Sequence, residues 1–408
     1  MSTRFLKPAI VPFAGLLLAA LFQGCSDGAD GAPGEPGPPG PTVIDMSTVS
    51  DDVLASLDVT SEITGVTIAS PPVVTFTLAT DGGLPIIGMV PYWEDSSRYV
   101  RFTITKLVPG EGTLPDNWVA YVRDEEGEPT YDTGSSLVDN EDGSYTFTFN
   151  TDVTMVEGVD YDPTLTHRVA GQVGSNSVPL EPQNMWIDFV PNGSDVTLTR
   201  DIAVMDSCNE CHVDLVFHGR RFEVQYCVQC HNPDLAEGEG NMSFMTHRIH
   251  AAGAFDVLDN AISYEEVTYP QSVSNCRKCH NGDDEATPQG NNWNDVPSIA
   301  ACSGCHEELS EGHGGGASCV TCHNDTIAPS VATAHLTENA TPNNPDLPQG
   351  QRDISYELIE ATIEGVNDLT VKFRILDGET ALDVTNLPED LATPGRFPGF
   401  LLAWAEPQ

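Results

Sequence analysis

Five copies of one short pattern, Cys-x-x-Cys-His, constrain this chain more than any other feature of its 408 residues. They contain ten of its 11 cysteines and lie within one segment. Two thiols three residues apart can add to the two vinyl groups of one haem, and the adjacent histidine then meets the iron axially. The pattern therefore predicts five covalently bound haem c groups. The attachment residues are the pairs Cys208/Cys211, Cys227/Cys230, Cys276/Cys279, Cys302/Cys305 and Cys319/Cys322, and the proximal iron ligands are His212, His231, His280, His306 and His323.

Zinc binding and disulfide pairing are the alternative uses of these cysteines. The first two motifs have the spacing of a zinc ribbon, and an exported chain can form disulfides. A ribbon needs no histidine after each cysteine pair, and disulfides leave the histidines without a role. Because a histidine follows all five pairs, the pattern favours haem.

The remaining histidines predict the second axial ligand of each iron. Of the 11 histidines, five are proximal, and His167 lies in a strand-like run that favours a structural role. Five are left for five haems, so we expect bis-histidine ligation throughout, which leaves the iron no open position for a substrate. Three methionines are alternative sixth ligands, but the one-to-one match favours packing roles for them. The distal candidates are His218, His247, His250, His313 and His335, and the methionines are Met205, Met242 and Met245.

The haem segment is predicted to cover residues 201–345. With about 30 residues per haem it is too short to surround five macrocycles with protein, so the haems must form its core. We expect short helices around the motifs and little other regular structure. His247 and His250 are three positions apart and share a helical face, so they are predicted to serve two neighbouring haems. Without haem the segment is not expected to fold.

The chain begins like an exported lipoprotein. Arg4 and Lys7 precede an apolar run that is too short to span a bilayer, so residues 1–24 are predicted to be a signal peptide. Cys25 resembles the lipid-accepting cysteine of bacterial lipoproteins, and ordinary cleavage that leaves a free thiol is the alternative. Residues 25–41 carry glycines at every third position, which we interpret as a Gly/Pro tether rather than a triple helix.

Residues 42–200 show the period-two pattern of half-buried strands, most clearly in the runs 73–78, 99–104, 118–122 and 145–149. Turn sequences separate the runs, so an antiparallel β-barrel or sandwich is predicted. Residues 346–408 resume strand character, and Val371-Lys-Phe-Arg-Ile375 resembles Val74-Thr-Phe-Thr-Leu78. The pattern indicates the start of a second β domain.

The composition is strongly acidic, with 61 Asp and Glu against 17 Lys and Arg and a formal net charge of −44. This charge excludes nucleic-acid binding, because every phosphate contact would be made against a repulsive field. We hypothesise that it favours contact with positively charged oxide particles. No phosphate-cradling glycine motif or twelve-residue calcium loop is present, and Gly312–Gly316 is interpreted as a turn.

Several motifs resemble the OmcA/MtrC family of outer-membrane multihaem cytochromes. They are Cys208-Asn-Glu-Cys-His212 with the following His218-Gly-Arg-Arg, Cys227 to His231 with the following Asn-Pro, Phe244 to His250, Ile63 to Pro72, and Thr166-His-Arg-Val. In that family a β-barrel domain precedes a pentahaem domain, and the pair is then repeated. This chain resembles the N-terminal half. It is expected to be a truncated gene product, with a natural half-length form completed by another chain as the alternative.

The resemblance implies a function in extracellular electron transfer. Electrons would pass from an outer-membrane porin and a periplasmic multihaem cytochrome to acceptors such as iron or manganese oxides, with flavin as a mediator or cofactor. The chain would be lipid-anchored in the outer membrane and face the cell exterior. It would be an electron-transfer protein rather than a classical enzyme, although terminal metal reduction stays open. The alternatives are a periplasmic electron carrier and a multihaem reductase of a small molecule, which would need an open axial position.

Overall fold

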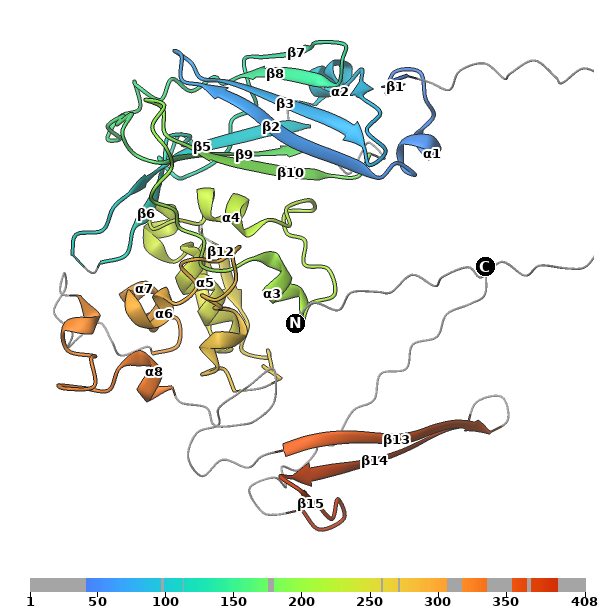
Figure 1. Ribbon diagram of the computed structural model, residues 1–408, viewed down its shortest axis with the longest axis vertical. Helices are drawn as coiled ribbons and strands as arrows, with labels where there is room; N and C mark the ends of the chain where they lie inside the picture. Colours follow the sequence, from blue (N-terminus) through green and yellow to red (C-terminus); the bar gives the residue numbers. More distant parts are fainter. Residues whose placement is uncertain are drawn as a thin grey trace, which may run out of the picture. The chain divides into compact units, whose positions relative to one another are not determined.

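The computed structural model describes residues 42–96, 99–112, 114–174, 180–257, 260–270, 272–306, 318–335, 354–364 and 368–387. The predicted signal peptide, Cys25, the tether and His313 lie outside these ranges. In the part of the chain that is described, no helix is both long and apolar enough to cross a membrane. The described residues form a β-rich N-terminal part, a helix-poor segment and a C-terminal hairpin (Figure 1).

The N-terminal part is a sandwich of two four-stranded antiparallel sheets, and within the described residues the sheets do not close into a barrel. Each predicted run overlaps a strand, although the strand in the run 118–122 ends at Ala120. Alternating apolar residues bury one face of most of these strands. The first sheet has the order β2 (Val59–Thr67), β3 (Val73–Thr80), β8 (Ser144–Thr148), β7 (Ser136–Asp139). The second has the order β10 (Gln183–Phe189), β9 (His167–Val173), β5 (Val100–Val108), β6 (Asn117–Ala120). Smaller elements are β1 (Ile44–Asp45), β4 (Ile86–Ile87), α1 (Asp51–Leu54) and α2 (Val90–Asp95).

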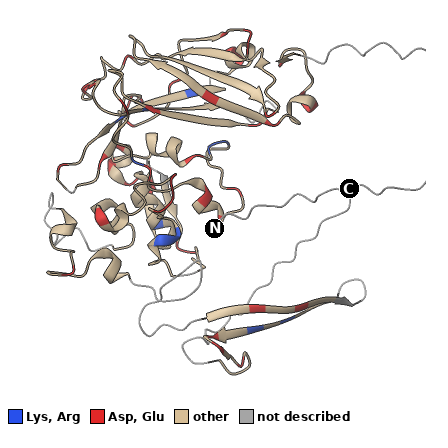
Figure 2. Cartoon of the chain, viewed as in Figure 1, with Lys and Arg blue, Asp and Glu red and all other residues tan. Residues whose placement is uncertain are grey.

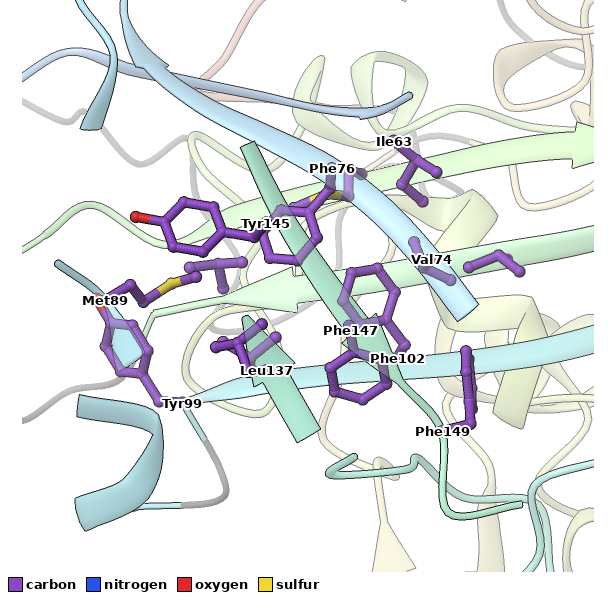
Figure 3. Close-up of a cluster of buried hydrophobic side chains, with 14 of the residues drawn as sticks. Ile63, Val74, Phe76, Met89, Tyr99, Phe102, Leu137, Tyr145, Phe147 and Phe149 are labelled. Atoms are coloured by element: carbon purple, nitrogen blue, oxygen red, sulfur yellow. The ribbon is translucent and has the colours of Figure 1, made fainter. Parts of the chain in front are cut away.

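Aromatic side chains from both sheets fill the core of the sandwich (Figure 3). The ring centres of Phe102 and Phe147 are 4.7 Å apart, and those of Phe76 and Tyr145 are 5.4 Å apart. All four side chains are fully buried. Burial of each large apolar side chain contributes roughly 1.5–3 kcal/mol, so these rings are a main source of the stability of the sandwich.

Strands β5 and β9 differ from the half-buried strands that the sequence pattern predicts, because nearly all of their residues are buried on both faces. The second face of their sheet contacts helix α4 (Val224–Cys230) of the helix-poor segment. Polar residues on that face therefore have protein partners instead of water. For example, the Thr105 hydroxyl donates to Gln229 Oε1 at 2.7 Å in a buried position.

Among its described residues the helix-poor segment contains only short helices, as predicted, and the longest of these has nine residues. One small hairpin joins β11 (Ala254–Val257) and β12 (Asn260–Ser263). The other elements are α3 (Met205–Asn209), η1 (Leu235–Gly238), α5 (Met242–His250), η2 (Cys276–Lys278), α6 (Asn292–Asp295), α7 (Ile299–Ser303), η4 (Cys319–Thr321) and α8 (Val331–Ala334).

The C-terminal hairpin repeats the geometry of β2 and β3. It consists of β13 (Ile354–Glu364) and β14 (Asp368–Asp377), with β15 (Thr380–Ala381) at the edge. Phe373 lies opposite Leu358, as Phe76 lies opposite Ile63, and a β-bulge follows at the same place in both hairpins. The sequence similarity between the two segments thus extends to their strand register. Ile63 is 3% exposed, whereas Leu358 is 65% exposed.

Candidate haem-binding site

All five Cys-x-x-Cys-His motifs adopt the same backbone turn. In each motif the histidine N–H donates to the carbonyl of the first cysteine, at 2.8 to 3.0 Å. Residues three apart on such a turn lie on one face, which brings both thiols of a motif to the same side. This is the arrangement that attachment of two adjacent vinyl groups requires.

The ten motif cysteines are free thiols in the structure. Among the described residues, no three or more His, Cys, Asp or Glu side chains gather in a metal-binding group. A structural zinc site collects four such ligands, and a disulfide joins two thiols. The described cysteines do neither.

Three of the predicted attachment residues are not covered by the polypeptide. Cys211, Cys305 and Cys322 are exposed, whereas the other seven motif cysteines are half-buried. Each exposed residue is the second cysteine of its motif. The polypeptide by itself therefore does not enclose the thiols of Cys211, Cys305 and Cys322. The physical reason is that a segment with so few residues per motif has too little chain to bury all ten thiols.

Four proximal histidines each have a second imidazole beside them. Two imidazoles that bind one metal ion on opposite sides, at roughly 2.0–2.1 Å per nitrogen, have ring centres about 6 Å apart. The observed separations of 6.0 to 6.3 Å fit one iron between each pair. The pairs are His212 with His250 at 6.3 Å, His231 with His218 at 6.1 Å, His280 with His247 at 6.0 Å, and His306 with His335 at 6.0 Å.

The sequence did not indicate which histidines meet. His247 and His250 of α5 lie beside the histidines of two different motifs, as their helical spacing predicts. His218 meets a motif that follows it, and His335 meets a motif that precedes it. The fifth proximal histidine is His323, and the spare histidine left for it, His313, lies outside the described residues.

Backbone carbonyls fix the orientation of several of these rings. The Nδ1 atoms of His231, His250 and His335 lie 2.9, 2.8 and 2.8 Å from the carbonyls of Gly240, Thr246 and Val331, respectively. The Nδ1 atom of His323 lies 2.9 Å from the Pro329 carbonyl. A ring that donates from Nδ1 keeps the lone pair of Nε2 for a metal ion.

Removal from water also favours the metal-binding form of these histidines. Burial lowers the pKa of His231 and that of His247. Burial also lowers the pKa of His280 to about 4, and the nearby charge of His247 contributes to this shift. Burial, followed by the charge of Arg221, lowers the pKa of His218 to about 4. These four imidazoles are therefore neutral at physiological pH, and a neutral imidazole is the form that ligates iron.

Two residues for which the sequence favoured structural roles, His167 and Met205, also have defined positions. His167 is fully buried in β9, where its Nδ1 and Nε2 lie 2.9 and 3.0 Å from the Leu165 carbonyl and the Tyr121 hydroxyl. Met205 is buried in the first turn of α3. Both positions agree with the structural roles that the sequence favoured.

The motifs are neighbours in an order that differs from the sequence. Burial raises the pKa of Cys208 to about 11, with a contribution from the Cys279 thiol, and raises that of Cys227 to about 12, with a contribution from Cys208. Burial likewise raises the pKa of Cys276 to about 11, and the thiol of Cys305 contributes. Burial also raises the pKa of Cys302, and the thiol of Cys319 contributes. These contributions link neighbouring motifs in the order second, first, third, fourth and fifth.

A buried cation connects the sandwich to this segment. The Arg168 guanidinium donates to Asp188 at 2.6 and 2.7 Å and to Asp201 at 2.9 Å. It also lies between the rings of Trp118 and Trp186, at 4.6 and 4.5 Å from their centres. Asp201 is the first residue of the predicted haem segment, so Arg168 fixes where that segment leaves the sandwich.

Comparison with known proteins relates this arrangement to a family. Residues 200–345 match the family model described as outer membrane cytochrome MtrC/MtrF-like, domains II/IV. The multiheme cytochrome MtrC of Shewanella baltica (strain OS185) is 28% identical over 342 residues, which are 78% of this chain and 47% of that protein. The chain is thus similar to members of the OmcA/MtrC family of multihaem cytochromes.

Two solved structures share the fold of this chain. The crystal structure of the outer-membrane decaheme cytochrome OmcA has a TM-score of 0.58 and 21% identity, over 82% of this chain and 55% of that one. MtrC from Shewanella baltica OS185 has a TM-score of 0.53 and 23% identity, over 80% of this chain and 52% of that one. The chain therefore spans about half the length of these relatives.

Proposed function

We propose that this chain conducts electrons through five haem c groups, each held between two histidines. The observation that carries the proposal is the set of four histidine pairs with ring centres 6.0 to 6.3 Å apart, each with one member in a Cys-x-x-Cys-His motif. A haem bound in this way supplies one-electron redox chemistry with no open iron position. The protein residues attach it and orient it.

The proposed distal ligands are His250 for the first motif, His218 for the second, His247 for the third and His335 for the fourth. His313 is proposed for His323 because the other spare histidines lie beside other motifs. The neighbour relations of the cysteines support a route that runs through the second, first, third, fourth and fifth motifs. Electrons can pass in either direction along such a chain.

The same proposal covers location and partners. We infer that Cys25 carries a lipid anchor and that the protein faces the cell exterior, where it passes electrons to iron or manganese oxides, directly or through flavin. A porin and a periplasmic multihaem cytochrome are the proposed electron donors. Similarity to the OmcA/MtrC family and the lipoprotein-like start of the sequence support this placement.

The alternative of a small-molecule reductase depends on an open axial position. Four proximal histidines have a second imidazole beside them, which argues against an open position at these sites. The decision therefore rests on the haem at His323. A reductase would need this haem to lack a second protein ligand.

The decisive experiment measures haem number and spin state on the full chain, matured in a host that attaches haem c. Intact mass is expected to give five covalent haems, and low-temperature paramagnetic resonance is expected to show only low-spin iron. Fewer than five haems would overturn the proposed stoichiometry. Five haems with one high-spin signal would instead support the reductase.

A further inference from the structure

The start of the haem segment is anchored by one of the few cations of this protein. Lys and Arg are sparse in the described chain, whereas acidic residues occur in all its parts (Figure 2). The Arg168 guanidinium is fully buried in the sandwich and donates to the Asp201 carboxylate at 2.9 Å. A buried ion pair resists separation, because either partner alone would be a buried charge without compensation. Asp201 therefore has a fixed position.

A second segment is attached to this fixed residue through Gln289, which forms three hydrogen bonds with residues 199–201. Its Oε1 accepts from the Asp201 N–H at 2.8 Å, and its own N–H donates to the Asp201 carbonyl at 3.2 Å. Its Nε2 donates to the Thr199 hydroxyl at 2.9 Å. Gln289 belongs to residues 281–295, which we call the connector segment.

One part of the connector segment holds the backbone beside the third motif. The Thr287 hydroxyl donates to the Asn281 carbonyl at 2.6 Å, and Thr287 is only 2% exposed. Gly290 lies against the same group, since a Cβ atom there would be 2.6 Å from the Asn281 carbonyl oxygen. Asn281 directly follows the proximal His280. The residues on either side of Gln289 therefore limit how the backbone at His280 can move.

The end of the connector segment, α6, holds the helix that precedes another ligand. Asn294 Oδ1 accepts from the Ala332 N–H at 2.9 Å. Ala332 is in the first turn of α8, where the N–H groups have no partner inside the helix. Helices α6 and α8 contact each other (Figure 1). His335 directly follows α8, and its ring centre lies 6.0 Å from that of His306.

We propose that Gln289 is a positioning residue for the ligands of two haems, the proximal His280 of the third motif and the distal His335 of the fourth. The inference rests on the proposed function. Groups outside the first coordination shell orient metal ligands and tune the metal. The sandwich thereby orients two haem ligands from a distance, because Gln289 is bound to the residue that Arg168 holds.

The test compares the low-temperature paramagnetic resonance of full haem-loaded variants. A low-spin signal depends on the axial ligands and their surroundings, so a ligand that changes orientation shifts the signal of its own haem. The signals of the third and fourth haems are identified with His247→Ala and His335→Ala. Each of these variants removes one proposed distal ligand and is expected to convert one haem to high spin.

Gln289→Ala is expected to shift both identified signals and to leave the other three in place. Thr287→Val, which removes only a hydroxyl, is expected to shift the signal of the third haem alone. Asn294→Ala is expected to shift that of the fourth haem alone. Carbon monoxide can bind only where an imidazole leaves the iron. It is expected to bind the reduced Gln289→Ala protein roughly tenfold faster than the wild type, the usual size of effect when an outer-shell partner is lost.

Conservative variants separate positioning from a general loss of structure. Thr287→Ser keeps the hydroxyl and Asn294→Asp keeps the acceptor oxygen, so both should retain the wild-type signals. Asn140→Ala is the matched control for Asn294→Ala, because the Asn140 side chain donates to the Ser144 hydroxyl between β7 and β8, and no signal should move.

The inference would be overturned if Gln289→Ala moved only one of the identified signals, neither of them, or all five. Should Gln289→Ala fail to mature, unchanged signals in both Thr287→Val and Asn294→Ala would overturn it equally. Failure of the proposed function has a different signature. It would show as fewer than five haems in the wild type, or as five low-spin haems in both His247→Ala and His335→Ala.

Discussion

His335 shows how much depends on one imidazole in the haem segment. It follows α8, and its Nδ1 lies 2.8 Å from the Val331 carbonyl, which leaves Nε2 available. Its ring centre lies 6.0 Å from that of His306. The other described pairs have the same separation although the helices that carry them differ. A single side chain therefore decides whether each haem keeps its sixth ligand.

We expect His335→Ala to convert one of the five haems from low spin to high spin, because the iron held by His306 would lose its second imidazole. Low-temperature paramagnetic resonance measures this change. The control is His167→Gln, since His167 lies in the sandwich core beside Tyr121. That variant should keep five low-spin haems. Five low-spin haems in His335→Ala would contradict the proposed pairing.

Gly304 permits the close contact between the fourth motif and α5. A Cβ atom at this position would lie 2.6 Å from the His247 Cβ and 2.9 Å from the Phe244 carbonyl oxygen. Both belong to the backbone region of a helix, so neither can move without displacing α5. Gly304 is therefore needed for its lack of a side chain rather than for a special backbone angle.

Gly304→Ala is expected to destabilise the haem-loaded protein by roughly 1–3 kcal/mol, the usual cost of overpacking. Denaturant unfolding followed by haem absorption measures the change in the free energy of unfolding. Gly82→Ala is the matched control, because the contact there would be an ordinary 3.8 Å. Equal stabilities of the two variants would show that the fourth motif does not pack on α5 as described.

At the scale of elements, the sandwich gains stability from buried tyrosines. Burial raises the pKa of Tyr99, Tyr121 and Tyr145 well above the usual value. A pKa that is higher in the folded state means that folding favours the protonated phenol. The stabilising contribution is complete below about pH 10, the unfolded pKa. It is lost as the pH rises from there through the folded pKa.

We therefore expect the free energy of unfolding to fall steeply above about pH 10. Tyr145→Phe should lower it by about 1 kcal/mol at pH 7, because the hydroxyl donates to the Ile86 carbonyl at 2.9 Å. The same variant should show a shallower fall at alkaline pH, because one buried phenol no longer titrates. Urea unfolding followed by circular dichroism between pH 8 and pH 11 measures both effects. An unchanged alkaline slope would contradict this account.

The C-terminal hairpin also belongs to the scale of elements. Its bulge and register match those of β2 and β3, so similar alternation produced the same local structure twice. Its apolar positions differ in exposure, since Leu358 is 65% exposed whereas its counterpart in the sandwich, Ile63, is 3% exposed. The local sequence therefore determines the register and the bulge of the hairpin, whereas burial of its apolar face depends on other strands.

At the scale of the whole molecule, the net charge of −44 governs long-range attraction. We expect binding of the haem-loaded chain to positively charged oxide particles to weaken at least tenfold between roughly 10 mM and 150 mM salt, as the screening length falls from about 30 to about 8 Å. Sedimentation of protein with the particles measures this. Negatively charged silica is the control and should bind little at either concentration. Binding that does not change with salt concentration would exclude charge as the basis of contact with the oxide particles.

Much of the fold followed from local patterns. Alternation located the strands at 73–78 and 145–149, and the motifs located the short helices, because both depend on neighbours in sequence. The burial of β5 and β9 on both faces was not predicted. Their polar residues, such as Thr105, alternate as if exposed, and only contact with α4 covers them. The exposure of Cys211 and Cys322 was not predicted either, because the motif pattern is the same at buried and exposed positions.

The sequence by itself predicted the haem attachment residues, since both thiols and the proximal histidine of each motif lie within one turn. It also supplied as many spare histidines as motifs. Tertiary structure alone decided which spare imidazole lies beside which motif, because the intervening loops are long enough to permit many pairings. It also decided which motifs are neighbours and the hydrogen bonds that join Gln289 to Asp201. These features depend on packing between distant segments, which no local pattern records.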